Sequence, residues 1–259
     1  MIDIEKAEKE FENFLQNYDR QNGKIASKID HTYRTIKVSR EIAKSLNLDS
    51  ENIKLAEVIG LLHDLGRFEQ LNIYDTFDDK KSIDHGDLAV KLLFQDNLIV
   101  KFIKERKYDN IIYKAIKNHN KYSIEEGLNE EELLHAKIIR DADKTDIFEV
   151  MVRRIENEKE LYKTFNREII KKQFATPEVL EEFLKHKIID ITKIKNQIDK
   201  LILYVAFIYD YNFYKGLEII KEKKYIQRML SILDNCKETE GQTELIQNTA
   251  LEFLSKQIN

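Results

Sequence analysis

The sequence predicts an all-α protein. Glycine and proline, which interrupt helices most often, occur only 7 and 1 times among 259 residues, whereas 35% of the residues are charged and 42% are apolar. Apolar residues also recur at helical spacing along much of the chain. We therefore expect a single all-helical domain over residues 1–259, large enough to bury its core without disulfide bonds.

The first part of the chain contains the clearest helical patterns. Apolar positions in residues 2–15 predict an N-terminal helix, which a loop at Gly23 follows, and the period resumes over residues 30–46. Asp49–Ser50 is a typical N-cap for a third helix. We expect this helix to end at Gly66, because glycine is the usual residue just past a helix C-terminus.

The rest of the chain has one long irregular segment and further helices. Residues 68–84 are polar and poorly periodic, which predicts a long ordered loop, and loops of this length often carry function. The remaining helices are expected at residues 88–94, 111–117, 130–155, 177–184, 188–209 and 245–258.

Charge and apolar runs exclude several classes of protein. The 43 basic and 47 acidic residues give a net charge of −4 and are interspersed, so no basic field favours duplex nucleic acid. The longest apolar run, residues 201–209, is too short to span a bilayer, and residues 1–11 lack the pattern of a secretory signal. Cys236 is the single cysteine, as expected in a reducing compartment. We expect a cytoplasmic protein without membrane contact.

A set of histidines and aspartates carries the chemical information. Imidazole nitrogens together with carboxylate oxygens suit divalent transition metals, and the lack of cysteine ligands argues against a closed structural zinc site. An open catalytic site is therefore the sharper hypothesis. The residues concerned are His31, His63, Asp64, His85, His119, Asp141, Asp143 and Asp146.

His63 and Asp64 form the strongest local signal. Both lie within an apolar stretch near the expected end of the helix that begins after Ser50. Burial of two such polar groups costs several kcal/mol unless they are paired or coordinate a metal. The partial negative charge at a helix C-terminus also favours a nearby cation. The pair is thus a candidate metal site.

The order of these motifs resembles that of the HD-domain metal-dependent phosphohydrolase superfamily. After His31 come LLHDLGR at residues 61–67, DHG at 84–86, KNHNKY at 117–122 and RDADKTD at 140–146. The combination is far more specific than any one piece, and it spans roughly residues 31–152. The resemblance implies a helical core over about residues 25–155, with a C-terminal helical extension over about residues 156–259.

The resemblance also implies a ligand set for a divalent ion such as Mn, Fe, Ni, Mg or Zn. His31, His63 and Asp64 match the family's ligands directly. The distal ligand of the family is an aspartate that follows alanine, which matches Asp143, with Asp141 as the alternative. Histidines equivalent to His85 and His119 hold a second ion or contact phosphate in some subgroups, so one or two ions are expected. A Gly-Tyr-Pro signature, typical of the subgroup that cleaves cyclic dinucleotides, is missing.

The expected reaction is hydrolysis of a phosphomonoester or phosphodiester in a small phosphorylated substrate such as a nucleotide. A metal at Asp64 would activate water, and His119 or His85 would protonate the leaving oxygen if it is not a ligand. Arg67 and Lys144 are candidates to hold phosphate, although Arg67 would equally serve to cap its helix.

Two other functions remain open alongside this one. The first is a di-iron oxygenase of the same fold, and the second is a non-catalytic regulator that binds a nucleotide. His135 and His186 match no motif and are expected to be structural or surface residues.

Overall fold

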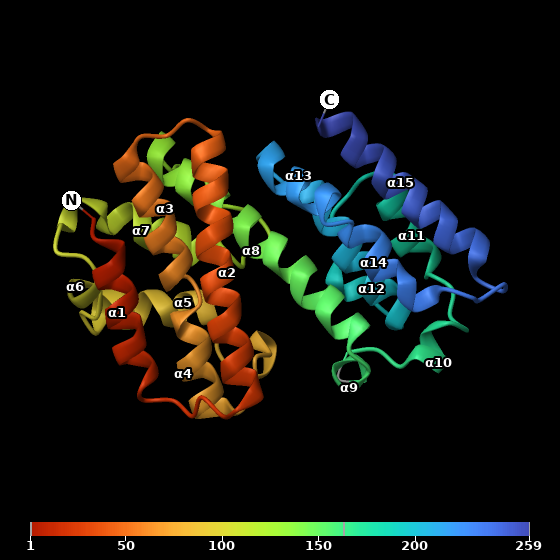
Figure 1. The fold of residues 1–259 in the computed structure, drawn as a ribbon, viewed down its shortest axis with the longest axis horizontal. Coiled ribbons are helices and arrows are strands. Elements are labelled where there is room, and N and C mark those ends of the chain that lie inside the picture. The colour runs from red at the N-terminus through yellow and green to blue at the C-terminus, as the bar shows by residue number, and fades with distance from the viewer. Residues whose placement is uncertain (1, 163, 259) are drawn as a thin grey trace. The chain divides into compact units, whose positions relative to one another are not determined.

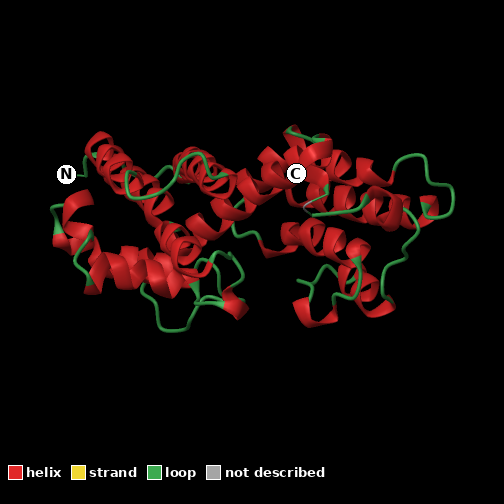
Figure 2. Ribbon diagram, turned by 90° about the horizontal axis from the view of Figure 1, so that it is seen from below, coloured by secondary structure: helices red, strands yellow, loops and turns green. Residues whose placement is uncertain are grey.

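The computed structural model describes residues 2–162 and 164–258, and every regular element within them is a helix (Figure 2). The predicted all-α class is therefore confirmed. The chain forms two compact units, one up to Asp143 and one from Lys144 onward.

The first unit is built from helices that pack around one apolar core. Helix α2 packs along α3, as Figure 1 shows, while α1 contacts α3 and α6, α4 contacts α5, and α7 contacts both α3 and α5. Phe11, Leu62 and Phe68 are fully buried in this core. The elements are α1 (Ile4–Leu15), α2 (Gly23–Ser45), α3 (Ser50–Leu62), α4 (Leu65–Tyr74), η1 (Asp79–Lys81), α5 (His85–Val90), η2 (Lys91–Gln95), α6 (Ile99–Phe102), η3 (Arg106–Tyr108), α7 (Asp109–Asn118) and the first half of α8 (Glu130–Glu156).

The second unit has its own core, in which α15 packs against α11, α13 and α14. Phe183, Ile202 and Met229 are fully buried there. The buried Asp199 carboxylate accepts hydrogen bonds from the Thr176 backbone N–H and hydroxyl, both at 2.7 Å, and so ties α12 to the start of α11. After α8 the elements are α9 (Glu158–Leu161), α10 (Arg167–Ile170), α11 (Pro177–Leu184), η4 (Ile191–Lys193), α12 (Gln197–Val205), η5 (Ala206–Asp210), α13 (Tyr214–Glu222), α14 (Tyr225–Leu230), η6 (Ser231–Leu233) and α15 (Glu240–Ile258).

The predicted loop over residues 68–84 is wrong in its first half. Helix α4 continues to Tyr74, because Phe68 and Leu71 lie one turn apart and are both buried on one face. Gly66 therefore lies inside a helix rather than past the end of one. The part after Tyr74 is irregular apart from the single turn of η1, as expected.

The predicted helix over residues 188–209 is also wrong, because the chain divides there into η4, α12 and η5. Asn196 begins a new helix by accepting a hydrogen bond from the Asp199 backbone N–H. By contrast, the helix predicted from the proline at position 177 occurs with the expected bounds, Pro177–Leu184.

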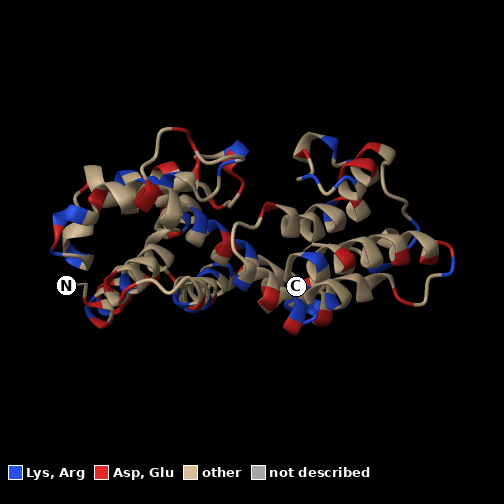
Figure 3. Ribbon diagram, turned by 90° about the horizontal axis from the view of Figure 1, so that it is seen from above, with Lys and Arg blue, Asp and Glu red and all other residues tan. Residues whose placement is uncertain are grey.

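Basic and acidic residues are interspersed along the helices of each unit (Figure 3), in agreement with the interspersed charges of the sequence. Within the described residues, no helix combines the length and the apolar character that a bilayer crossing requires.

Candidate metal centre

The His63-Asp64 pair lies at the break between two helices. His63 is the C-cap of α3 and Asp64 precedes the first residue of α4, so the predicted position at a helix end is confirmed. Both side chains are buried. The ring of His63 is fixed by its own helix, because Nδ1 lies 2.8 Å from the Gly60 carbonyl oxygen and donates to it. Its Nε2 atom is therefore unprotonated and presents a lone pair away from the carbonyl that Nδ1 contacts.

Two side chains from distant parts of the chain join this pair. His31 comes from the middle of α2, and its Nε2 atom lies 3.2 Å from His63 Nε2 and 3.4 Å from Asp64 Oδ2. Asp143 comes from α8, and its Oδ1 atom lies 3.2 Å from His31 Nε2 and 3.9 Å from His63 Nε2. Four donor atoms thus surround one position.

A second pair of histidines lies on the other side of Asp64. His85 is the first residue of α5 and His119 is the C-cap of α7. Their Nε2 atoms are 3.0 Å apart and lie 3.5 and 3.7 Å from Asp64 Oδ1. The two oxygens of Asp64 therefore face different histidine pairs, which is the arrangement of a carboxylate that can bridge two cations.

The donor chemistry of the cluster fits a metal. His85 Nδ1 lies 2.7 Å from Asp79 Oδ2, and His119 Nδ1 lies 2.6 Å from the Ile116 carbonyl oxygen, so both Nδ1 atoms are donors. Burial lowers the pKa of His85 to about 4 and that of His63 to about 3, which keeps both rings neutral at pH 7. Neutral imidazoles whose Nε2 lone pairs converge are suitable ligands for a divalent cation.

Charged groups hold the two carboxylates in the ionised form. Burial acts to raise the pKa of Asp64, but the Lys28 ammonium, 2.6 Å from Oδ2, and the surrounding histidines hold that pKa well below its usual value. Burial also opposes ionisation of Asp143, yet the hydrogen bond from His31 keeps its pKa below the ordinary range. Ionised carboxylates are the form that binds metal.

Two glycines allow the helices of the cluster to approach closely. A Cβ atom on Gly66 would lie 2.1 Å from the His85 carbonyl oxygen and 2.8 Å from the Ala89 nitrogen, so only glycine lets α4 meet α5 at this distance. A Cβ atom on Gly60 would lie 3.0 Å from Ser39 Oγ and 3.2 Å from Ile36 Cα, which is a milder restriction between α3 and α2. These contacts bring His85 and His31 to the HD pair.

Arg140 fixes the end of α7, next to His119. Its guanidinium is buried and donates from Nη1 to the carbonyl oxygens of Asn118 at 3.0 Å and of Lys121 at 2.5 Å, and from Nη2 to that of Tyr122 at 3.4 Å. A cation at the carbonyl end of a helix also interacts favourably with the helix dipole. Arg140 thus stabilises the turn from which His119 projects.

The structure brings together six of the predicted site residues. Three overlapping groups with ligand atoms within 4.8 Å of one another include His31, His63, Asp64, His85, His119 and Asp143. Asp141 is buried on α8 but is in none of these groups among the described residues, so the geometry favours Asp143 as the distal ligand. Their roles as ligands stay predictions.

The two predicted phosphate-binding residues contact other groups. Arg67 Nη1 lies 2.7 Å from Asp79 Oδ1 and 2.6 Å from the Phe77 carbonyl oxygen, while Arg67 Nε lies 3.9 Å from Asp64 Oδ1. Lys144 Nζ lies 2.5 Å from Asp210 Oδ2 within the second unit. His135 is buried apart from the cluster and lies 3.0 Å from Asn52 Oδ1 through Nε2.

Sequence reasoning missed three residues of this site: Lys28, Asp79 and Arg140. Lys28 lies one helical turn before His31, so the spacing alone places its side chain on the same face of α2. Arg140 directly precedes the acidic cluster of α8, although nothing in the sequence shows that its guanidinium reaches the end of α7. Asp79 lies in a segment without a clear apolar period, so the sequence pattern does not indicate the direction of its side chain.

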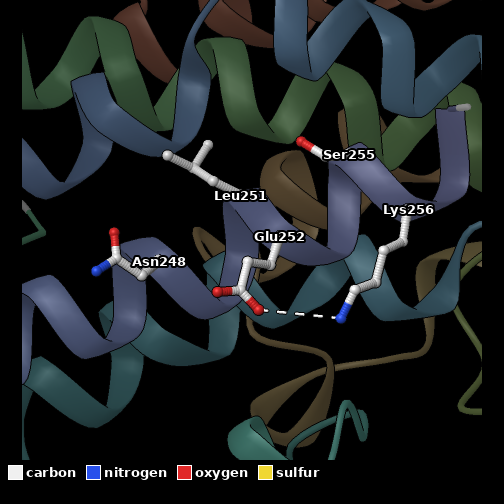
Figure 4. Close-up of a pocket in the computed structure, with 5 residues that line it drawn as sticks. All are labelled: Asn248, Leu251, Glu252, Ser255 and Lys256. Atoms are coloured by element: carbon white, nitrogen blue, oxygen red, sulfur yellow. Dashed lines mark ion pairs between the residues drawn. The ribbon is translucent and has the colours of Figure 1, made fainter.

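A surface depression outside the cluster lies along one helix of the second unit. It is lined by Asn248, Leu251, Glu252, Ser255 and Lys256 of α15, and Glu252 and Lys256 form an ion pair at 3.9 Å (Figure 4). This lining contains no histidine and shares no residue with the metal cluster. We assign it no function.

The fold and the cluster define a class: an all-α protein with converging, buried histidine and aspartate side chains that are able to hold a divalent cation. Residues 29–147 match the family model of the HD domain, in agreement with the resemblance that the motif order predicted. The HD-domain family consists mostly of metal-dependent hydrolases. No curated protein and no solved structure shows a significant match to the chain.

Proposed function

We propose that this protein is a metal-dependent phosphohydrolase that cleaves a small phosphate ester and uses two cation positions bridged by Asp64. The observation that carries the proposal is the pair of ligand groups that share this one carboxylate, His31, His63 and Asp64 on one side and Asp64, His85 and His119 on the other. A carboxylate shared by two cation positions is typical of two-metal enzymes, which clamp a phosphoryl group during in-line displacement with ions about 3.5–4 Å apart.

His31, His63, Asp64 and Asp143 would hold the first cation, and Asp64, His85 and His119 would hold the second. When bound there, a divalent cation makes water nucleophilic at neutral pH and neutralises charge on phosphoryl oxygens. Hydrogen bonds from Nδ1 leave His85 and His119 with Nε2 directed at Asp64 and at each other. This geometry supports the ligand role for both residues over the role of general acid.

Lys28 supplies a positive charge at the edge of the cluster. Its Nζ atom is 2.6 Å from Asp64 Oδ2, and its side chain is 23% exposed, so it reaches both the buried carboxylate and solvent. A flexible ammonium in this place can turn toward an incoming phosphate and attract it. We propose Lys28, rather than Lys144, as the residue that contacts substrate phosphate, with a nucleotide as one substrate that this chemistry would accept.

The test combines metal analysis with turnover. Purified protein is stripped of metal and titrated with Mn²⁺, Mg²⁺, Ni²⁺ or Fe²⁺, and hydrolysis of an aryl phosphate and a panel of nucleotides is then measured. We expect metal-dependent release of phosphate or of the alcohol, and loss of both metal and turnover in His63→Ala. The matched control is His135→Gln, since His135 is a buried histidine outside the cluster. Full metal content and turnover in His63→Ala would refute the assignment.

A di-iron oxygenase is the second candidate, and one observation favours it. Four imidazoles and a bridging carboxylate around two positions form a donor set that also suits iron. Oxygen consumption by the iron-loaded protein in the presence of a small organic substrate, without phosphate release from any ester, would select this function over hydrolysis.

A further inference from the structure

Asp79 connects an irregular segment to the second histidine pair. Its Oδ2 atom accepts a hydrogen bond from His85 Nδ1 at 2.7 Å. Its Oδ1 atom accepts from Arg67 Nη1 at 2.7 Å and from Gln70 Nε2 at 2.8 Å. Asn120 Nδ2 also donates to Oδ2, at 3.5 Å. The carboxylate thus receives donors on both oxygens, from the candidate ligand His85, from Asn120 and from two residues of α4.

His85 differs from two other histidines of the cluster in the way its ring is fixed. His63 and His119 donate from Nδ1 to the carbonyl oxygen three residues earlier, so the helix that carries each ring also orients it. His85 is the first residue of α5 and has no preceding helical turn to supply such an acceptor. Its acceptor is a side chain from η1, six residues earlier in the chain.

The segment that carries Asp79 is held in place by α4. Gln70 is fully buried, and besides Asp79 its Nε2 atom contacts Ser82 Oγ and the Ile83 carbonyl oxygen, both at 2.9 Å. Arg67 adds a hydrogen bond to the Phe77 carbonyl oxygen at 2.6 Å. These contacts fix the backbone on both sides of Asp79 and leave its carboxylate directed at His85.

We propose that Asp79 is a positioning residue that sets the occupancy of the second cation position independently of the first. The carboxylate holds His85 with the proton on Nδ1 and the lone pair on Nε2, and a carboxylate partner makes an imidazole a stronger ligand than a carbonyl partner does. Among the described residues, the side-chain partners of the Asp79 carboxylate are His85, Arg67, Gln70 and Asn120, and none of these is a proposed ligand of the first position. This inference rests on the proposed function only in that both positions bind divalent cations.

The experiment counts ions and measures their affinities in three variants. Metal-free wild type, Asp79→Asn, Asp79→Ala and Asp78→Asn are titrated with Mn²⁺ by calorimetry and with Co²⁺ by visible absorbance. Asp78→Asn is the matched control, because Asp78 is the neighbouring carboxylate and caps η1 through the Lys80 N–H. Circular dichroism and thermal unfolding of the metal-free proteins report folding. If Asp79→Ala does not fold, the metal affinities of the nearly isosteric Asp79→Asn variant test the inference.

We expect two ions in the wild type and in Asp78→Asn. In the Asp79 variants the weaker of the two sites should lose about 10- to 100-fold in affinity, with the Co²⁺ spectrum of the remaining site unchanged, as is typical when a partner of a ligand is removed. Three outcomes would overturn the inference. The Asp79 variants could keep wild-type affinity at both sites, they could lose affinity equally at both sites, or the wild type could bind only one ion. A wild type that binds two ions but cleaves no phosphate ester would instead overturn the proposed function.

Discussion

The two histidine pairs of the cluster are built in different ways. His31 lies in the middle of α2 and His63 is the C-cap of α3, and these two long helices pack directly along each other. His85 and His119 lie at the ends of α5 and α7, and their positions depend on Gly66, Asp79 and Arg140 from other elements. The placement of the first pair therefore follows mainly from the packing of two helices. The placement of the second pair depends on individual tertiary contacts that single substitutions can remove.

Removal of the carboxylate common to both pairs should have the largest effect. Asp64→Asn retains the shape of the side chain but not the charge that the two positions share. Because a metal supplies several kcal/mol of transition-state stabilisation, we expect turnover to fall on the order of 10³-fold, with both ions lost. Atomic absorption and a phosphatase assay measure these losses. Two ions retained at wild-type affinity would show that Asp64 is not the bridge.

Gly66→Ala should break the second pair selectively. Its new Cβ atom would lie 2.1 Å from the backbone oxygen of His85, so α4 and α5 must separate. We expect a loss of about 3 kcal/mol in the free energy of unfolding, measured by urea denaturation, and weaker metal binding at the second position than at the first. Gly60→Ala is the comparison. Its closest contacts are at 3.0 and 3.2 Å, so a loss of roughly 1 kcal/mol is expected. Equal losses in the two variants would contradict the prediction.

Arg140→Met tests the support of His119. The change removes a buried guanidinium and leaves the carbonyl oxygens of Asn118, Lys121 and Tyr122 without this donor. We expect a loss of about 2 to 3 kcal/mol in stability and faster amide exchange around residues 118–122. Arg153→Met is the control on the same helix, because Arg153 is exposed and forms an ion pair with Glu149 one turn away. A stability change as small as in this control would argue against the role of Arg140.

His135→Gln tests how a buried histidine that belongs to neither pair affects the pH dependence of stability. Burial lowers the pKa of His135 to about 4, whereas the unfolded chain titrates near 6.5. The unfolded state therefore binds more protons between these values, so stability is lost as the pH falls through this window. For metal-free protein we expect the wild type to lose about 1.5 to 2 kcal/mol more than His135→Gln between pH 7 and pH 5. Parallel stability curves from urea denaturation would refute this.

The sequence predicted the parts of the site that local pattern controls. The His63-Asp64 pair was placed correctly at a helix end, because the cap at Asp49 and the apolar run fix the extent of α3. The all-α class followed from the scarcity of Gly and Pro. The predicted end at Gly66 was wrong, since the demand for glycine there comes from α5, which packs against α4.

The parts that depend on contacts across the fold could not be predicted in the same way. Gln70 and Asp79 are polar residues in a region without clear period, and only the folded chain shows that they meet at His85. Arg67 was assigned to phosphate because of its place beside the HD pair, whereas the structure shows its Nη1 atom bound to Asp79 and Phe77. Sequence spacing gives the face of a helix, but it does not give the partner on that face.

The contact between Lys28 and Asp64 has a consequence for how the protein matures. A buried carboxylate without a counter-charge would strongly oppose folding, but the ammonium at 2.6 Å already balances it. The folded chain therefore does not need an ion to balance the charge of Asp64, and an ion bound at the proposed position would displace the lysine from that carboxylate. A metal-free chain is therefore expected to be folded before any ion binds.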